Sequence, residues 1–169
     1  KIDEPTGGYE YSRSGNPTRA ALEKRLATLE EAKYGLAFSS GLAATTTLLL
    51  SLLKAGDKVL ASDDLYVGTR RLFTKIFAKN FGVTFNYVDT TKLSNVQNEL
   101  SKKNKIVCIE SPTTPLLKFS DISEIAKNAA TSFRETSVGS SASNIGHLAD
   151  HRTHNLPIIG YREPNQAYG

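Results

Sequence analysis

A short segment rich in serine and glycine, Ser39 to Leu42, separates an apolar β-type stretch from an apolar helical one. Glycine at such a junction lets a ligand approach the backbone closely. The free N–H groups and the positive end of the following helix favour a phosphate. Because no complete dinucleotide-binding or Walker pattern surrounds the segment, the residues alone leave two interpretations open: a phosphate cup, or an ordinary strand-to-helix turn.

Two later segments carry side chains that suit the same kind of ligand. Tyr66 lies in the stretch Asp63–Thr69, after a short apolar run, where an aromatic ring can stack on a flat cofactor. The alternative is a tyrosine on the rim of the fold without a ligand. Glu110 opens the stretch Glu110–Pro115, in which two prolines restrict the backbone. Its carboxylate is expected either at the same site or as a helix-capping acid in a structural loop.

The N-terminal stretch holds one more pair of candidates. Arg13 can grip a phosphate with two donors, and the hydroxyl of Tyr11 adds another. Taken alone, the pair is typical of a surface arm. Three histidines, His147, His151 and His154, have helical spacing, but no acid or cysteine completes a ligand set. We therefore expect no metal site.

Alternating patterns of strand and helix must position these residues. Helices are expected over residues 17–34, 42–53, 69–80, 93–100 and 121–130, and strands over residues 35–39, 58–61, 83–87 and 106–109. Asn16 is expected to cap the first helix, and Ser120 or Asp121 the last. This order predicts an α/β fold in which a mostly parallel sheet is flanked by helices. Ligands of such sheets bind beyond the carboxyl ends of the strands.

Composition narrows the class of protein. The chain has 169 residues, of which 39% are hydrophobic and 22% charged, as in a folded domain. Its single cysteine, Cys108, lies in an apolar stretch, so we expect a core residue and no disulfide framework. No segment resembles a signal peptide or a membrane span, which favours the cytoplasm. The net charge is +4, but basic residues alternate with acids, so neither nucleic acid nor membrane is an expected partner.

Four motifs occur in the order found in one family of enzymes. They are Tyr-Glu-Tyr-Ser-Arg-Ser-Gly-Asn-Pro-Thr-Arg (Tyr9–Arg19), Ser-Ser-Gly-Leu-Ala-Ala-Thr (Ser39–Thr45), Asp-Asp-Leu-Tyr-Val-Gly-Thr (Asp63–Thr69) and Glu-Ser-Pro-Thr-Thr-Pro (Glu110–Pro115). In these motifs the chain resembles the transsulfuration (Cys/Met metabolism) family of fold-type I pyridoxal-phosphate (PLP) enzymes, which includes cystathionine γ-lyases and γ-synthases. The resemblance extends from about Tyr9 to Ala130.

The resemblance implies a cofactor, pyridoxal 5′-phosphate, and a role for each candidate residue. Gly41 and Leu42 would give backbone N–H groups to the PLP phosphate, and Tyr66 would stack on the pyridine ring. Tyr11 and Arg13 would reach the phosphate bound by the neighbouring subunit, so the site would be built across a dimer.

The chain also departs from the family pattern. Val67 stands where the family has glycine, and Thr114 where it has asparagine, whereas Glu110 would still lie close behind the cofactor. The Asp-Asn-Thr strand end and the Ser-Ala-Thr-Lys segment of the family are not found in this sequence, and Lys92 and Lys118 lack a motif that would make them substitutes. We therefore expect no Schiff-base lysine, no aspartate for the pyridine nitrogen, and hence no catalytic residue.

Three regions are expected along the chain. Residues 1–15 form an N-terminal arm for dimer and cofactor contacts, residues 16–130 a partial PLP-binding large domain, and residues 131–169 a divergent, irregular tail. In the tail only Leu156 to Ile159 is predicted as a brief strand. Because the chain begins with Lys1 and contains no methionine, a missing or processed N-terminus is expected.

Two functions are compatible with these observations. The first is a PLP-dependent carbon–sulfur lyase or γ-replacement enzyme of cystathionine or a related sulfur amino acid, assembled as a homo-oligomer and truncated or frame-altered near residue 131. The second is a catalytically inactive fragment that pairs with a full-length family subunit. A cofactor adduct on a lysine of this chain favours the first, and the lack of one favours the second.

Overall fold

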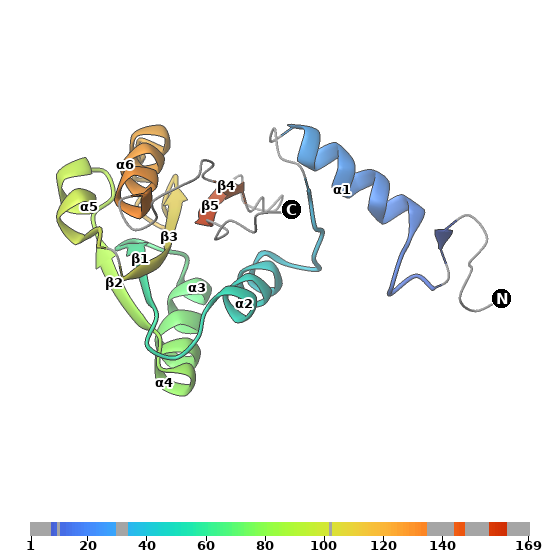
Figure 1. Cartoon of the computed structure of the whole chain (residues 1–169), viewed down its shortest axis with the longest axis horizontal. Coiled ribbons are helices and arrows are strands. Elements are labelled where there is room, and N and C mark those ends of the chain that lie inside the picture. The colour runs from blue at the N-terminus through green and yellow to red at the C-terminus, as the bar shows by residue number, and fades with distance from the viewer. Residues whose placement is uncertain are drawn as a thin grey trace. The chain divides into compact units, whose positions relative to one another are not determined.

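The computed structural model comprises two compact units, Lys1–Ser39 and Ser40–Gly169 (Figure 1). It describes residues 8–9, 11–29, 34–101, 103–134, 144–147 and 156–161. The described part of the first unit contains one α-helix, whereas the second unit contains a sheet with helices.

The helix of the first unit, α1 (Pro17–Leu29), begins where the sequence predicts. The Asn16 side chain caps it, because its Oδ1 accepts hydrogen bonds from Thr18 N at 2.9 Å and from Arg19 N at 3.1 Å. Proline suits the first helical position because the N–H that it lacks has no partner there. The expected cap is therefore confirmed.

The second unit alternates helices and strands in the predicted order. Its elements are α2 (Gly41–Leu52), β1 (Lys58–Ser62), α3 (Val67–Arg71), η2 (Leu72–Phe77), α4 (Ala78–Phe81), β2 (Thr84–Val88), α5 (Leu93–Glu99), β3 (Asn104–Ser111), α6 (Ile122–Arg134), β4 (Asn144–His147) and β5 (Leu156–Tyr161). α3, η2 and α4 form one continuous helix with a π-helical middle, which Gly82 ends in the left-handed conformation (φ 65°). Asp121 caps α6, since its Oδ1 accepts a hydrogen bond from Glu124 N at 3.0 Å.

The described strands form a single sheet in the order β2-β1-β3-β5-β4. β1 pairs in parallel with β2 on one side and with β3 on the other. β5 pairs antiparallel with β3, and β4 with β5. The parallel strands with helices between them confirm the predicted α/β class.

Two strand predictions differ from the structure. The strand expected over residues 35–39 is wrong, because residues 34–38 have no regular structure and no described strand pairs with them. The strand predicted at Leu156 to Ile159 extends to Tyr161 as β5, and β4 was not predicted at all. Glycine in both strands and proline in β5 weaken the sequence signal. Pairing stabilises both strands, β5 with β3 and β4 with β5.

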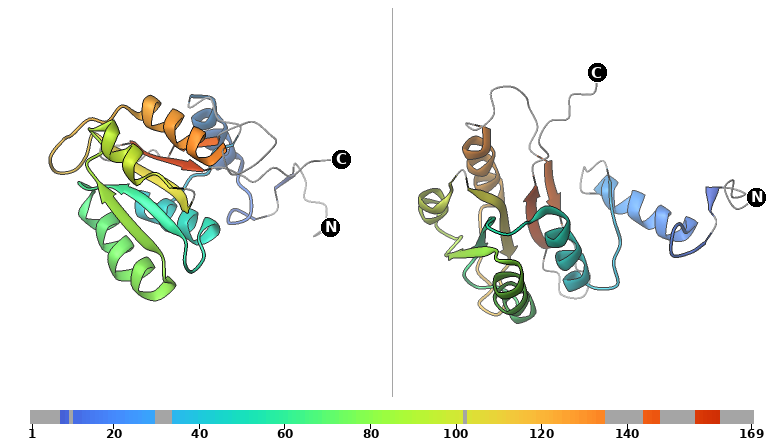
Figure 2. Two further views of the ribbon diagram at one scale, coloured as in Figure 1. Left: turned by 60° about the vertical axis from the view of Figure 1, so that its left-hand side comes forward. Right: turned by 60° about the horizontal axis from the view of Figure 1, so that its bottom comes forward.

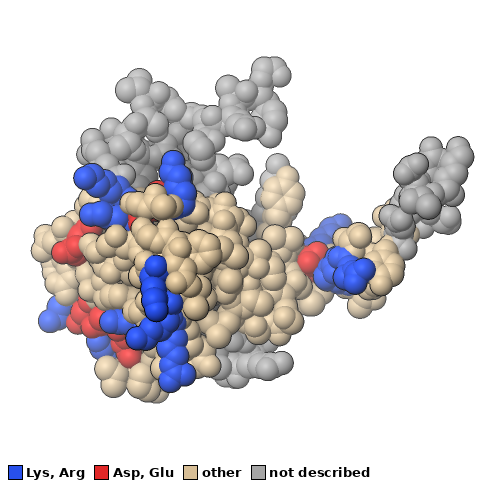
Figure 3. Space-filling view, turned by 90° about the horizontal axis from the view of Figure 1, so that it is seen from below, with Lys and Arg blue, Asp and Glu red and all other residues tan. Residues whose placement is uncertain are grey.

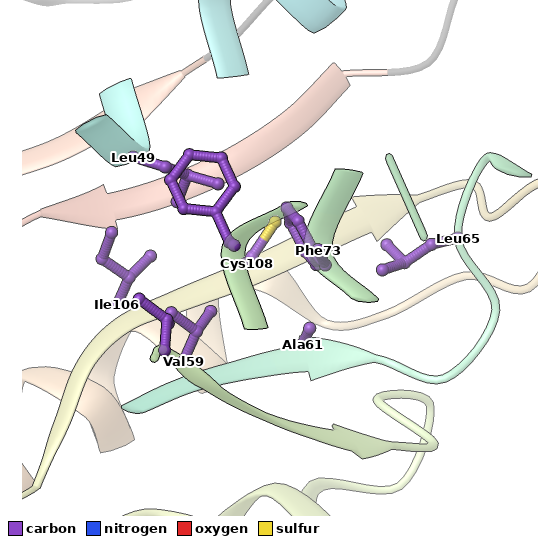
Figure 4. Close-up of a cluster of buried hydrophobic side chains, with 9 residues drawn as sticks. Leu49, Val59, Ala61, Leu65, Phe73, Ile106 and Cys108 are labelled. Atoms are coloured by element: carbon purple, nitrogen blue, oxygen red, sulfur yellow. The ribbon is translucent and has the colours of Figure 1, made fainter. Parts of the chain in front are cut away.

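Helices cover both faces of the parallel strands (Figure 2). Successive residues of a strand point to opposite faces. Val59 and Ala61 of β1 therefore pack in one cluster with α2 and the α3–α4 helix, while Leu60 packs in the other with α5 and α6. Figure 4 shows the first cluster, in which Cys108 lies near Phe73. Cys108 is a core residue, as expected, and burial raises the pKa of its thiol to about 12.

The buried face of β3 makes a stability prediction. Ile106 is fully buried (0% exposed), whereas Ile76 on η2 is 42% exposed. Ile106→Val removes one packed methyl group and should lower the free energy of unfolding by about 0.5–1.5 kcal/mol. Ile76→Val, the same chemical change at the surface, should alter it by less than about 0.5 kcal/mol. Urea unfolding followed by circular dichroism measures both, and equal effects would contradict this description of the core.

Candidate functional site

The carboxyl ends of the parallel strands meet at one edge of the sheet, and hydroxyl groups tie them together. Ser62 Oγ, at the end of β1, lies 3.1 Å from Thr90 Oγ1, just beyond β2. Thr90 Oγ1 in turn lies 2.7 Å from Ser120 Oγ, and Ser120 N donates to Ser111 Oγ at the end of β3 (3.0 Å). These contacts hold the loops that follow the three strands in fixed positions relative to one another.

Two aspartates hold the loop that follows β3. Asp64 Oδ2 accepts hydrogen bonds from Thr113 Oγ1 at 2.5 Å and from Leu116 N at 3.0 Å. Lys118 Nζ pairs with Asp63 at 3.2 Å, and this hydrogen bond raises the pKa of the Lys118 ammonium group. Because an amine must lose its proton before it attacks a carbonyl, the geometry disfavours Lys118 as a nucleophile.

The predicted phosphate cup lies at the N-terminus of α2. Ser40 is the N-cap, and its side-chain oxygen accepts a hydrogen bond from Ala43 N at 3.1 Å. Gly41 and Leu42 are the first two residues of the helix, whose N–H groups have no partner within the helix itself. Together with the helix dipole, these groups form a site of positive potential for an anion.

Tyr66 lies beside this helix end. A Cβ atom added to Gly68 would overlap the Tyr66 ring and come within 3.0 Å of Leu42 Cδ1. The two side chains therefore both pack over the bare Cα of Gly68, which places the aromatic ring next to the first turn of α2. Val67, one of the two substitutions expected to depart from the family pattern, is 55% exposed, so its side chain does not occupy the same space.

Glu110 reaches the same place from the end of β3. It is 5% exposed, and its Oε2 accepts a hydrogen bond from Tyr66 N at 2.9 Å. Burial raises the pKa of the Glu110 carboxyl, while the hydrogen bonds from Tyr66 and Thr114 act in the opposite direction. The structure thus brings together four expected site residues, namely Gly41, Leu42, Tyr66 and Glu110.

Tyr11 and Arg13 belong to the first unit. The Arg13 guanidinium lies 4.8 Å from the centre of the Tyr11 ring, and the Tyr11 side chain is 56% exposed. Arg19 stabilises the turn that carries them, because its guanidinium donates to the carbonyl oxygens of Ser12 and Ser14 at 3.1 and 3.2 Å. The two side chains are presented together on a hydrogen-bonded turn.

The hydroxyl chain and Gly68 are the parts of the site that sequence reasoning missed. Thr90 and Ser120 each lie just beyond the end of a predicted strand or just before a predicted helix, which was the available signal. The role of Gly68 could not be predicted, because only the structure shows which atoms a side chain at this position would meet.

In the described part of the chain, neither a purely basic surface nor a cluster of metal ligands indicates a second kind of binding site. Figure 3 shows basic side chains intermixed with acidic ones on one face. Where the structure describes side chains, no three His, Cys, Asp or Glu residues gather as a possible metal site. His151 and His154 lie outside the described residues, and for His147 only the backbone is described. None of the described helices has the length and apolar character that crossing a membrane requires.

The N-terminus of α2, which suits a phosphate, lies next to an aromatic ring at the carboxyl edge of the parallel strands. This arrangement is typical of the cofactor-binding side of an α/β enzyme domain. The family described as Cys/Met metabolism PLP-dependent enzyme matches residues 1–138. The chain belongs to this family.

Known proteins agree with this assignment. The chain is 52% identical over 118 residues to cystathionine γ-lyase of Dictyostelium discoideum, and 47% identical over 122 residues to a probable cystathionine γ-synthase of Herpetosiphon aurantiacus. These matches cover 70% and 72% of this chain and 30% and 38% of the relatives. The crystal structure of cystathionine γ-lyase from Lactobacillus plantarum, complexed with L-serine, superposes with a TM-score of 0.72 at 46% identity, covering 79% of this chain and 34% of that one.

The buried Glu110 carboxyl makes a prediction about pH. Because its pKa in the folded protein is raised above the ordinary value of 4.5, its contribution to stability is present below that value and is lost as the pH rises through the raised pKa. Glu110→Gln cannot titrate. Relative to the wild type, Glu110→Gln should therefore be more stable at about pH 7 than at about pH 4, so the difference in free energy of unfolding (variant minus wild type) should be larger at the higher pH.

Urea unfolding at both pH values tests this expectation. Ser62→Ala is the control, since it removes a hydroxyl that accepts a hydrogen bond from Glu110 N but removes no titrating group. The loss of stability in Ser62→Ala should be the same at both pH values. A Glu110→Gln effect that is also independent of pH would contradict the raised pKa.

Proposed function

We propose that this chain forms the phosphate- and ring-binding part of a PLP-dependent enzyme that breaks or exchanges carbon–sulfur bonds in cystathionine or a related sulfur amino acid. The observation that carries the proposal is that the side chains of Leu42 and Tyr66 both pack against Gly68, at the N-terminus of α2. The curated relatives in the comparison, named as lyases and a synthase of cystathionine, support the substrate class.

The residues fit the chemical groups of PLP. Its dianionic phosphate suits the N–H groups of Gly41 and Leu42, and its flat ring suits the face of Tyr66. The absence of a Cβ at Gly68 keeps the ring of Tyr66 next to that helix end. When bound, PLP supplies an electron sink for the substrate, and the protein supplies binding and orientation. Glu110 holds the backbone of Tyr66 from behind.

We further propose that the 169-residue chain holds PLP without a covalent bond. No lysine in it stands in the family's Ser-Ala-Thr-Lys context, and Lys118, at the same sheet edge, is engaged by Asp63. Turnover of a sulfur amino acid would then require residues supplied from elsewhere. The cytoplasm is the proposed location, which is supported by the single, unpaired Cys108.

A charge placed at the helix end tests the phosphate cup. Gly41→Asp should weaken PLP binding about tenfold or more, because a carboxylate repels the phosphate at close range. Thr47→Asp, at an exposed position of the same helix, adds the same charge farther along α2 and should have little effect. Acids in the first turn stabilise a helix, so unfolding of α2 would not explain weaker binding. Absorbance titration with PLP, and with pyridoxal as the ligand that lacks phosphate, measures the affinities.

Borohydride reduction of the PLP-loaded chain, followed by mass spectrometry, tests the non-covalent part. No lysine of this chain should carry the reduced adduct. A stoichiometric adduct would overturn that part of the proposal and favour an active enzyme. Equal PLP affinities for Gly41→Asp and the wild type would overturn the cup.

A second candidate function is supported by the exposed Tyr11–Arg13 pair. The pair lies on a turn that Arg19 holds in place, so an arginine and a phenol are offered together to an outside phosphate. We infer that a chain of this kind also pairs with a full-length subunit of the family and contributes these side chains to the partner's PLP site.

A mixing experiment tests this pairing. The full-length D. discoideum relative, with the residues that align with Tyr11 and Arg13 replaced by alanine, should bind PLP weakly, and adding this chain should restore affinity several-fold. Arg13→Ala should abolish the restoration because the guanidinium supplies two of the phosphate donors. Lys24→Ala, which removes an exposed cation from α1, is the matched control. Restoration by Arg13→Ala to the wild-type level would refute the contribution of the arm.

A further inference from the structure

The start of α3 is held by a charged group from a different strand. Tyr66 is the N-cap of α3, and its side chain makes no capping hydrogen bond. Its N–H donates instead to Glu110 Oε2 at 2.9 Å, across 44 residues of sequence. The direction in which the chain enters α3, and with it the origin of the Tyr66 side chain, therefore depends on a carboxylate at the end of β3.

Glu110 is itself held in place by contacts within the protein. Its backbone N–H donates to Ser62 Oγ at 3.3 Å, which ties it to the end of β1, and its side chain is almost fully buried. A buried carboxylate is costly unless hydrogen bonds compensate it, so its bond to Tyr66 N is not readily exchanged for water. A charge-assisted hydrogen bond is also stronger than a neutral one. Glu110 thus acts as a rigid acceptor.

The ring of Tyr66 has a second fixed point. Its edge packs over Gly68, where Leu42 of α2 also packs. The backbone nitrogen is held from β3 and the ring edge is held against α2. A displacement of the backbone nitrogen moves the Cα and Cβ atoms of Tyr66 and therefore changes the angle at which the ring packs over Gly68.

We propose that Glu110 is a positioning residue that sets the angle of the Tyr66 ring relative to the N-terminus of α2 without contacting the ligand. What the ring binds rests on the function proposed above, whereas its placement by Glu110 exists with or without a ligand. Loss of the carboxylate should therefore change recognition of a flat ring while leaving recognition of phosphate intact.

The chain contains no tryptophan, so Tyr66→Trp supplies a single fluorescent reporter at the site. In that background, Glu110→Ala should raise the acrylamide quenching constant of the indole about twofold, with no ligand present. Glu110→Gln keeps an oxygen that can accept from the backbone N–H and should restore the lower value. Ile106→Val is the structural control, since it loosens the buried packing of the same strand and leaves Glu110 and its hydrogen bonds in place.

The second measurement uses the chain with Tyr66 intact. Glu110→Ala should weaken binding of PLP about tenfold, because the ring of Tyr66 would have to be ordered on binding, and weaken binding of inorganic phosphate less than about twofold. A purely structural role would lower both affinities together, and that outcome overturns the proposal. Unchanged quenching in Glu110→Ala, or an equal rise in Ile106→Val, also overturns it. Increased quenching together with no PLP binding by the wild type would refute the proposed function and support the positioning by Glu110.

Discussion

The pairing of β1 between two parallel neighbours is the constraint on which the site depends. Ala61 stands level with Tyr87 of β2 and with Cys108 of β3, so the three strands end at one edge. Their following loops are then forced together, and residues far apart in the sequence become neighbours. The contact between Tyr66 and Glu110 exists only because the strands that carry them run in the same direction and in this register.

Each acid at this edge is engaged by the protein. Asp63 pairs with Lys118, Asp64 accepts from the loop after β3, and Glu110 accepts from Tyr66 N. Negative side chains would otherwise repel an anionic ligand. Because the oxygens of these acids accept hydrogen bonds from other groups, they do not occupy the N–H groups at the start of α2, which can act on an anion at the same edge.

Much of the fold could be predicted from the sequence, because apolar periodicity and capping residues are local signals. The helix that begins at Pro17 was predicted at its first residue, and α2 and β3 were predicted over residues 42–53 and 106–109, close to their observed bounds. β4 could not be predicted, since its stability comes from pairing with β5 and not from its own residues. Spacing also could not show that Glu110 bonds to the backbone of Tyr66, because that contact depends on strand register. The motifs nevertheless indicated four residues that the structure brings together.

The neighbouring positions Val67 and Gly68 explain which departure from the family pattern the fold tolerates. Val67 points to solvent at the start of α3, whereas any side chain at Gly68 would displace the Tyr66 ring. A change of glycine to valine is therefore compatible with the site at the first position and incompatible at the second.

The placement of β5 has a consequence for assembly. The outer edge of β3 offers one row of backbone donors and acceptors, and β5 pairs with it from Val107 to Ser111. A strand from any other part of a larger sheet cannot use that row while β5 remains there. Growth of the sheet next to β3 thus requires an exchange of strands, in which β5 leaves before its replacement docks.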